Sequence, residues 1–294
     1  MSDLSNLINP LVSICIPTYN GAEFIEEALN SALNQTYQNI EIIVSDDKSS
    51  DGTLEIVQDK LSQSKVPYHI YNHDPKGIGT NWNHCVEKSN GVFIKFLFQD
   101  DLLREDCIEK MLEIASVDAK VGLVYCKRTI IYDPCNIEHT KWIDHYAVLH
   151  KKWYNIEINK GIIQGKVYLS DRNLLSDPPN KIGEPTAALI KKEYFKKAGN
   201  FDESLKQTLD IEYWYRLMKY CKVGFVDEEL VSFRLHNEQA SFVNMYNEIN
   251  ERDVLNKKFY KTIFWQLHPQ RKWKMFKSNS WTGDVIRFFK GCFK

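Results

Sequence analysis

The feature that most restricts the fold is the alternation of short apolar, β-rich runs with stretches of helical periodicity in the first half of the chain. The expected strands are Leu11 to Ile16, Ile40 to Val44, Tyr68 to Tyr71, Val92 to Phe98 and Val121 to Cys126. The expected helices are Glu23 to Leu33, Thr53 to Leu61, Asn81 to Lys88 and Arg104 to Ile114. Because strands joined by single helices form crossover units, this pattern predicts an α/β fold with a largely parallel sheet covered on both faces.

Composition is that of an ordinary globular protein and argues against several functional classes. The 294 residues are 43% hydrophobic, which is enough to fill a core. Lys and Arg number 38 against 39 Asp and Glu, so the formal net charge of -1 gives no sign of nucleic-acid binding. The 7 cysteines include no CxxC pair, so we expect neither a zinc site nor a disulfide framework, and a reducing cytoplasm fits best. No apolar run approaches the ~18 residues of a membrane span, and the N-terminus lacks the pattern of a secretion signal.

Acidic pairs follow two of the expected strands. Asp46 and Asp47 come after the second strand, and Asp100 and Asp101 come after the fourth. In parallel sheets, ligands bind beyond the carboxyl ends of the strands. Carboxylates crowded at such an edge repel each other unless a cation joins them, and a divalent metal with oxygen ligands is the simplest candidate. Taken singly, each pair also suits a turn or a helix cap, so that alternative stays open.

The chain has no glycine-rich cradle for phosphates. It contains no G-x-x-x-x-G-K-[ST], and no G-x-G-x-x-G follows the first expected strand. A nucleotide at the acidic edge would therefore need a metal to neutralise its diphosphate, and Asp101, with or without Asp100, is placed to hold that metal. The same ion would act as a Lewis acid on a departing diphosphate.

One long segment is similar to a known family. The residues from Val12 to Thr53, VSICIPTYNGAEFIEEALNSALNQTYQNIEIIVSDDKSSDGT, closely resemble the opening of glycosyltransferase family 2. The resemblance continues through NWNHCVEKSNGVFIKFLFQDDLL, GNFDESL and DIEYWYRL, and covers roughly residues 10 to 240. It implies a GT-A fold, which is a Rossmann-like, mostly parallel sheet flanked by helices, here followed by a C-terminal helical extension. It also implies a nucleotide-sugar donor, a divalent metal (Mn2+ or Mg2+), and inverting transfer of one sugar to an acceptor hydroxyl.

The resemblance assigns the donor site to the first two strand ends. Pro17, Thr18 and Tyr19 match the segment whose backbone lines the nucleotide pocket, and Asp46 matches the aspartate that pairs with the base. The alternative for all of them is a turn that ends a strand.

The resemblance places the metal at the fourth strand end. Asp100 and Asp101 match the family's DxD-type element, with Asp101 as the direct metal ligand and Asp100 as a binding residue for the nucleotide sugar. The longer acidic element common in the family has an acid where this chain has Phe98, which leaves open how the ribose is held. His236 matches a histidine that approaches the metal or the diphosphate, although a lone histidine is also often structural.

Asp210, at the start of DIEYWYRL, matches the catalytic base of the family. An inverting displacement needs a carboxylate on the acceptor side of the anomeric carbon to take the hydroxyl proton. The alternative is a helix N-cap, which an aspartate satisfies as well. Glu212 would face elsewhere on the helix and is secondary.

These assignments predict a domain organisation. Residues 1–240 form the catalytic domain, with a nucleotide-binding half (1–126) and an acceptor half (127–240), and residues 241–294 form a helical, basic and aromatic extension. Regular alternation is lost from Arg128 to Lys181, which indicates an irregular insertion or lid, or a plain solvated connection. From Arg271 to Lys294 basic and aromatic residues are interleaved, which suits an interfacial helix on an anionic bilayer and a lipid-linked acceptor. The alternative is a terminal helix that docks its aromatic residues on the domain.

The leading hypothesis is an inverting, metal-dependent glycosyltransferase. It would add one sugar to a surface polysaccharide, lipopolysaccharide or other glycoconjugate, in the cytoplasm and at the inner face of the membrane. One alternative is a catalytically silent partner that binds nucleotide sugars. Another is an aspartate-nucleophile phosphatase built on Asp46, but Lys48 and Ser49 break the D-x-D-x-[TV] spacing that it requires.

Overall fold

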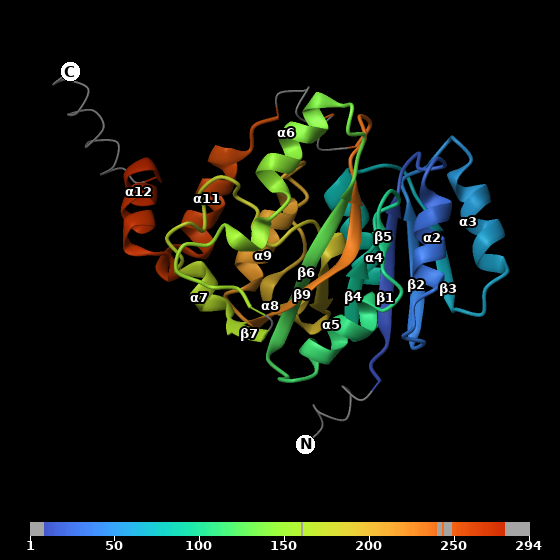
Figure 1. The fold of residues 1–294 in the computed structure, drawn as a ribbon, viewed down its shortest axis with the longest axis horizontal. Coiled ribbons are helices and arrows are strands. Elements are labelled where there is room, and N and C mark those ends of the chain that lie inside the picture. Colours follow the sequence, from blue (N-terminus) through green and yellow to red (C-terminus); the bar gives the residue numbers. More distant parts are fainter. Residues whose placement is uncertain (1–8, 160, 240–242, 244–248, 280–294) are drawn as a thin grey trace.

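The structure, a computed structural model, describes residues 9–159, 161–239, 243 and 249–279 (Figure 1). Within these residues the strands form one nine-stranded sheet in the order β3-β2-β1-β4-β8-β6-β9-β5, with β7 paired to β9 off this path. Helices cover both faces of the sheet, and the C-terminal helices lie at the end of the molecule farthest from α3. The α/β fold class expected from the sequence is confirmed.

The first part of the sheet is parallel. It consists of β1 (Val12–Thr18), β2 (Ile40–Asp46), β3 (Tyr68–Asn72) and β4 (Phe93–Phe96). Every residue of β1, β2 and β4 is buried, which explains their nearly continuous apolar runs, because each is covered on both faces. The β1–β2 register ends with Thr18 opposite Asp46, so both residues reach the same edge.

Single helices connect these strands, as the alternation predicts. They are α2 (Ile25–Leu33), α3 (Thr53–Ser62), α4 (Ile78–Lys88) and α5 (Cys107–Ala115), whose bounds differ from the expected ones by a few residues at most. Successive side chains of β1 enter different hydrophobic clusters, since Ile14 packs with residues of α2 and Cys15 packs with residues of α4. This two-sided core fixes the parallel strands and leaves their carboxyl ends for ligands.

Beyond β4 the sheet is mixed. The next strand in space, β8 (Ala188–Lys191), runs antiparallel to both β4 and β6 (Val121–Ile131). Next to them, β9 (Lys222–Arg234) is parallel to β6 and pairs antiparallel with the short β5 (Leu102–Leu103). Strands distant in sequence thus meet here without a regular crossover helix.

The region from Arg128 to Lys181 is more regular than the sequence indicates. It contains the end of β6, α6 (Ile137–Tyr146), the 3-10 turn η1 (Leu149–Lys151), β7 (Gly161–Gln164) and α7 (Gly165–Leu169). These elements are short and only some of their residues are buried, so they show little hydrophobic periodicity. Because the end of β6 and β7 both pair with β9, part of this region belongs to the sheet, and the region is not a plain solvated connection.

The last described elements form the expected C-terminal helical extension. After η2 (Pro185–Ala187), α8 (Glu193–Ala198) and α9 (Leu209–Leu217), helix α11 (Arg252–Thr262) packs on α9, and α12 (Pro269–Asn279) packs on α11 beyond η3 (Phe264–Gln266). None of the helices in the described ranges is long and apolar enough to cross a membrane. The rest of the predicted membrane-binding tail, residues 280–294, lies outside the described residues.

Candidate active site

Asp46 is the anchor of the first two strand ends. Its side chain is fully buried and accepts hydrogen bonds from Thr18 Oγ1 at 2.8 Å, Ser49 Oγ at 2.5 Å and the Ser49 backbone N–H at 2.8 Å. A carboxylate with both oxygens engaged in this way cannot attack a phosphorus atom, so the phosphatase alternative fails. The geometry does fit a residue that shapes the loop around a ligand.

The segment expected to line a nucleotide pocket is divided between core and surface. Pro17 and Thr18 are buried, whereas the Tyr19 side chain is 55% exposed at the carboxyl edge. Gln99, which the sequence reading overlooked, ties this loop to the one after β4. The Tyr19 N–H donates to Gln99 Oε1 at 2.9 Å, and Gln99 Nε2 donates back to the Tyr19 carbonyl at 3.1 Å.

A cluster of histidines beside this edge was also missed. Ser45 Oγ lies 2.9 Å from His73 Nε2 and 2.8 Å from His84 Nδ1, and Asp47 Oδ1 lies 3.2 Å from His73 Nδ1. Burial raises the pKa of Asp47, and burial together with His73 lowers the pKa of His84. Although Asp47, His73 and Ser45 are arranged as in a hydrolase triad, Ser45 is fully buried and shared by two imidazoles, so it cannot act as a nucleophile. The position of His73 two residues after the third expected strand was the available signal.

Asp101 lies in the core rather than at the surface. Its side chain is 0% exposed, and its oxygens accept from Thr186 Oγ1 at 2.6 Å and from the Arg234 N–H at 3.1 Å. Burial, reinforced by the adjacent Asp100, raises the pKa of Asp101 well above its usual range. Asp101 therefore joins the loop after β4 to η2 and β9, and this position argues against its expected role as the direct metal ligand.

Asp100 and His236 meet at the open edge instead. Asp100 Oδ2 lies 2.9 Å from His236 Nε2, and the two side chains are 18% and 22% exposed. Arg234 fixes the Asp100 backbone by donating from Nε to its carbonyl at 3.0 Å. The Asp100 carboxylate suits Mn2+ or Mg2+ when substrate phosphates supply further ligands, and the His236 imidazole is a common metal ligand beside it. Among the residues that the structure describes, no three His, Cys, Asp or Glu side chains form a complete metal site.

Phe98 occupies the position where the longer acidic element has an acid. Its ring stacks on Trp82, with 5.1 Å between the ring centroids. Trp82 is 6% exposed and also contacts Phe96 and Phe201, so it belongs to the core. An aromatic contact has replaced a carboxylate here, and any ribose contact must come from elsewhere.

Asp210 lies in the first turn of α9, where its carboxylate is desolvated. Oδ2 accepts from Asn180 Nδ2 at 2.7 Å, and Oδ1 accepts from the Ile211 N–H at 2.7 Å. Desolvation and the nearby Glu184 carboxylate raise the pKa of Asp210 to about 7. The helix N-cap is Thr208, so Asp210 is not the cap residue. Glu212 is buried in an ion pair with Arg216 at 2.7 Å and is structural.

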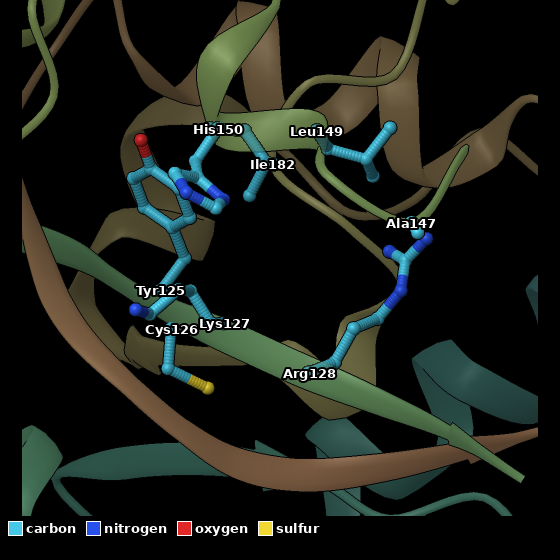
Figure 2. Close-up of a pocket in the computed structure, with 8 residues that line it drawn as sticks. All are labelled: Tyr125, Cys126, Lys127, Arg128, Ala147, Leu149, His150 and Ile182. Atoms are coloured by element: carbon cyan, nitrogen blue, oxygen red, sulfur yellow. The ribbon is translucent and has the colours of Figure 1, made fainter. Parts of the chain in front are cut away.

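One pocket, between β6 and the segment around η1, is too small for a sugar nucleotide. It has a volume of about 10 Å³, close to the minimum for one water molecule. Figure 2 shows Tyr125 pointing toward His150 and Ile182, and Arg128 extending toward Ala147.

Comparison with known sequences identifies the family. The model of glycosyl transferase family 2 matches residues 13–199. An uncharacterised glycosyltransferase of Rickettsia typhi is 32% identical over 288 residues, which span 97% of this chain and 81% of that protein. The chain belongs to glycosyltransferase family 2 and is a glycosyltransferase, as the resemblance implies.

Solved structures agree on the fold. S. aureus TarS in complex with UDP-GlcNAc has a TM-score of 0.62 and 17% identity, covering 92% of this chain and 74% of that one. The mannosyltransferase PcManGT from Pyrobaculum calidifontis, in complex with GDP-Man and Mn2+, has a TM-score of 0.57 and 15% identity, covering 97% and 80%. At such identities the likeness establishes the GT-A fold alone.

Proposed function

We propose that this glycosyltransferase moves a single sugar, with inversion, from a nucleotide-sugar donor to an acceptor hydroxyl, and that Asp210 is its base. The observation that carries the proposal is the desolvated Asp210 carboxylate, whose pKa of about 7 suits proton transfer near neutral pH. A partner that only binds nucleotide sugars would gain nothing from such a group.

The chemistry assigned to Asp210 is a single displacement. The acceptor oxygen attacks the anomeric carbon and forms the new glycosidic bond, while the bond from that carbon to the diphosphate oxygen breaks with its electron pair. Asp210 takes the acceptor proton as the bond forms. Attack from the face opposite the diphosphate inverts the configuration. The bond from Asn180 Nδ2 holds one carboxylate oxygen in place for this step.

The donor is proposed to lie over the ends of β1 and β2. Pro17, Thr18 and Tyr19 would line the nucleotide pocket, with Tyr19 as the exposed side chain, and Asp46 would shape the loop that meets the base. TarS was captured with UDP-GlcNAc and PcManGT with GDP-Man, so the likeness to them does not favour one base.

The metal is proposed to bind at Asp100 and His236, the pair that faces the open edge. When bound, a divalent ion would supply positive charge to the departing diphosphate. Asp101 would not contact the metal but would hold the loop that carries Asp100 in place. PcManGT, which was captured with Mn2+, supports a divalent ion in this fold.

We also propose that the two parts of the catalytic domain bind different substrates. Residues 1–126 bind the donor, and residues 127–240 bind the acceptor. The acceptor would be a glycan or a lipid-linked glycan of a surface polysaccharide, lipopolysaccharide or other glycoconjugate. Asp210 lies in the second part, which supports this division.

The C-terminal extension, residues 241–294, is the proposed contact with the inner face of the membrane. In its described part Trp265 is 80% exposed and Trp273 is 57% exposed. Basic residues outnumber the acidic Glu251 and Asp253 in 249–279; they are Arg252, Lys257, Lys258, Lys261, Arg271, Lys272, Lys274 and Lys277. Met275 is buried and Arg271 Nε donates to the Arg172 carbonyl at 2.7 Å, so these residues dock α12, while Trp273 remains available for an anionic bilayer.

A thermal-shift screen tests the donor and metal assignments. Purified protein is melted with UDP-, GDP-, dTDP- and CMP-sugars, each with Mn2+ and with chelator, because a ligand of the native state raises the melting temperature. We expect one nucleotide class to stabilise the protein only when the metal is present. Release of nucleoside diphosphate from that donor then tests catalysis, and binding without any release would favour a silent binding partner.

A further inference from the structure

Glu184 lies in a turn that is fixed to the helix of the base. Asn180 Oδ1 accepts from the Gly183 N–H at 2.9 Å, while Asn180 Nδ2 donates to Asp210. The Gly183 carbonyl accepts from Trp214 Nε1 at 3.0 Å. Because Asp210 and Trp214 are one helical turn apart, the turn is attached to α9 at two successive levels. Glu184, the next residue after Gly183, is thereby held near Asp210.

Arg128 holds the Glu184 side chain from the other side. Arg128 Nη1 donates to Glu184 Oε2 at 2.5 Å, and Nη2 donates to the Tyr146 carbonyl at 3.0 Å. The guanidinium lies 5.4 Å from the Trp142 ring centre and 5.6 Å from that of Phe233. Since the Arg128 side chain is only 5% exposed, it needs a carboxylate partner, and Glu184 supplies one.

Gly183 allows this close approach. Its φ is +114°, a conformation that side chains rarely adopt. A Cβ at this position would lie 3.2 Å from Arg128 Nη1 and 3.2 Å from Ala187 Cβ. Any side chain here would press on the Arg128 guanidinium and on η2 together.

The charges around Asp210 oppose one another. Glu184, at the start of η2, raises the pKa of Asp210, and Arg128, from β6, lowers it. Tyr215 of α9 is buried and neutral, and Asn180 carries no charge. The negative charge of Glu184 is thus the largest influence, after burial, that raises the pKa of Asp210.

We propose that Glu184, clamped by Arg128, is a positioning residue for Asp210 that makes it a stronger proton acceptor. The inference rests on the proposed role of Asp210 as base and adds what tunes that base. Through Trp142 and Tyr146, helix α6 takes part in holding Arg128, so the segment between β6 and β7 contributes to the active site without touching the reacting atoms. The sequence gives no sign of this, because Glu184 lies 56 residues from Arg128 and 26 from Asp210.

The test is a direct titration of Asp210 in the ligand-free, metal-free protein. The carboxyl carbon of Asp210 is followed by NMR in protein labelled at aspartate, and its signal is assigned by its loss in Asp210→Asn. Glu184→Gln removes the negative charge but keeps an oxygen for Arg128. We expect the Asp210 midpoint to move to lower pH by about one unit. Glu184→Asp should give an intermediate midpoint, and the exposed Glu87→Gln should leave it unchanged.

Two outcomes separate this inference from the proposed function. Equal midpoints in the native protein, Glu184→Asp and Glu184→Gln would overturn the tuning role, even if Asp210→Asn is inactive. Turnover retained by Asp210→Asn would instead remove Asp210 as base. If Glu184→Gln does not fold, the comparison of Glu184→Asp with the native protein decides alone. The acid limb of nucleoside diphosphate release should move in the same direction as the midpoint.

Discussion

The two ends of the proposed active site, one for the donor and one for the acceptor, surround their carboxylates differently. At the donor end, Asp46 and Asp101 are fully buried, and each accepts hydrogen bonds from two other residues. At the acceptor end, Asp210 is bonded by Asn180 and its own helix, and faces another carboxylate at Glu184. Buried aspartates of the first kind hold loops together. Asp210 accepts hydrogen bonds from as many residues, but it is partly exposed, which suits a group that takes a proton from a bound substrate.

The largest effect should come from removing the base. Asp210→Asn cannot take the acceptor proton, so the rate of sugar transfer should fall by roughly 10² to 10⁴. Donor binding, measured by thermal shift with the nucleotide sugar and Mn2+, should be retained. The neighbouring Glu212→Gln serves as a matched carboxylate control. A comparable loss there would mean that the helix, and not Asp210, is what matters.

Next in size is the loss of metal-dependent donor binding at the open edge. Asp100→Ala and His236→Ala should each abolish the stabilisation that the nucleotide sugar gives only with Mn2+. Their melting temperatures without ligand should stay near that of the native protein, since both side chains are partly exposed. If the stabilisation by nucleotide sugar still requires Mn2+ in both variants, Asp101 and not this pair is the metal ligand.

The burial of Asp101 predicts that its replacement destabilises the protein. Asp101→Ala leaves the buried Thr186 hydroxyl and the Arg234 N–H without their acceptor, which should lower the free energy of unfolding by about 1–3 kcal/mol for each group. Asp101→Asn should cost less, because an amide keeps one acceptor and buries no charge. Urea unfolding measures both, with the exposed Asp74→Ala as control. Equal stability of all three variants would contradict the structural role.

The raised pKa of Asp210 makes stability fall as pH rises. With a pKa of about 7 when folded and about 3.9 when unfolded, the folded state holds more protons between these values. The contribution is full below pH 4 and is lost by pH 7. Asp210→Asn should therefore raise the melting temperature at pH 8 relative to the native protein, and by less at pH 5. The same difference at both pH values would mean that Asp210 titrates normally.

The smallest effect concerns the C-terminal surface. Trp265→Ala and Trp273→Ala should each weaken the affinity for anionic vesicles, measured by co-sedimentation, by about 1 kcal/mol, or roughly fivefold. Neutral vesicles should bind poorly because they lack the anionic headgroups that attract the basic residues. Phe259→Ala changes a fully buried residue of α11 and serves as the control, because it disturbs the packing of the helices without removing an exposed aromatic side chain. If both tryptophan variants bind vesicles as well as the native protein does, the extension only docks on the rest of the protein.

Much of the parallel part of the fold could be predicted from local pattern. The buried runs at β1, β2 and β4 and the helices between them carry strong periodicity, because each residue there meets the core. The mixed part could not be predicted in the same way. β7 pairs antiparallel with β9, some sixty residues later in the chain, and its own four residues hold no regular pattern.

The amino-acid sequence by itself determined the crossover fold, the family and the strand ends at which carboxylates gather. Only the tertiary structure decided how each carboxylate is buried and which groups it contacts. Asp101 is buried by Thr186 and Arg234, 85 and 133 residues away, and Asp100 is left to meet His236 at 136 residues. Adjacent aspartates look alike in the sequence. Their desolvation and hydrogen-bond partners come from distant segments that only folding brings together.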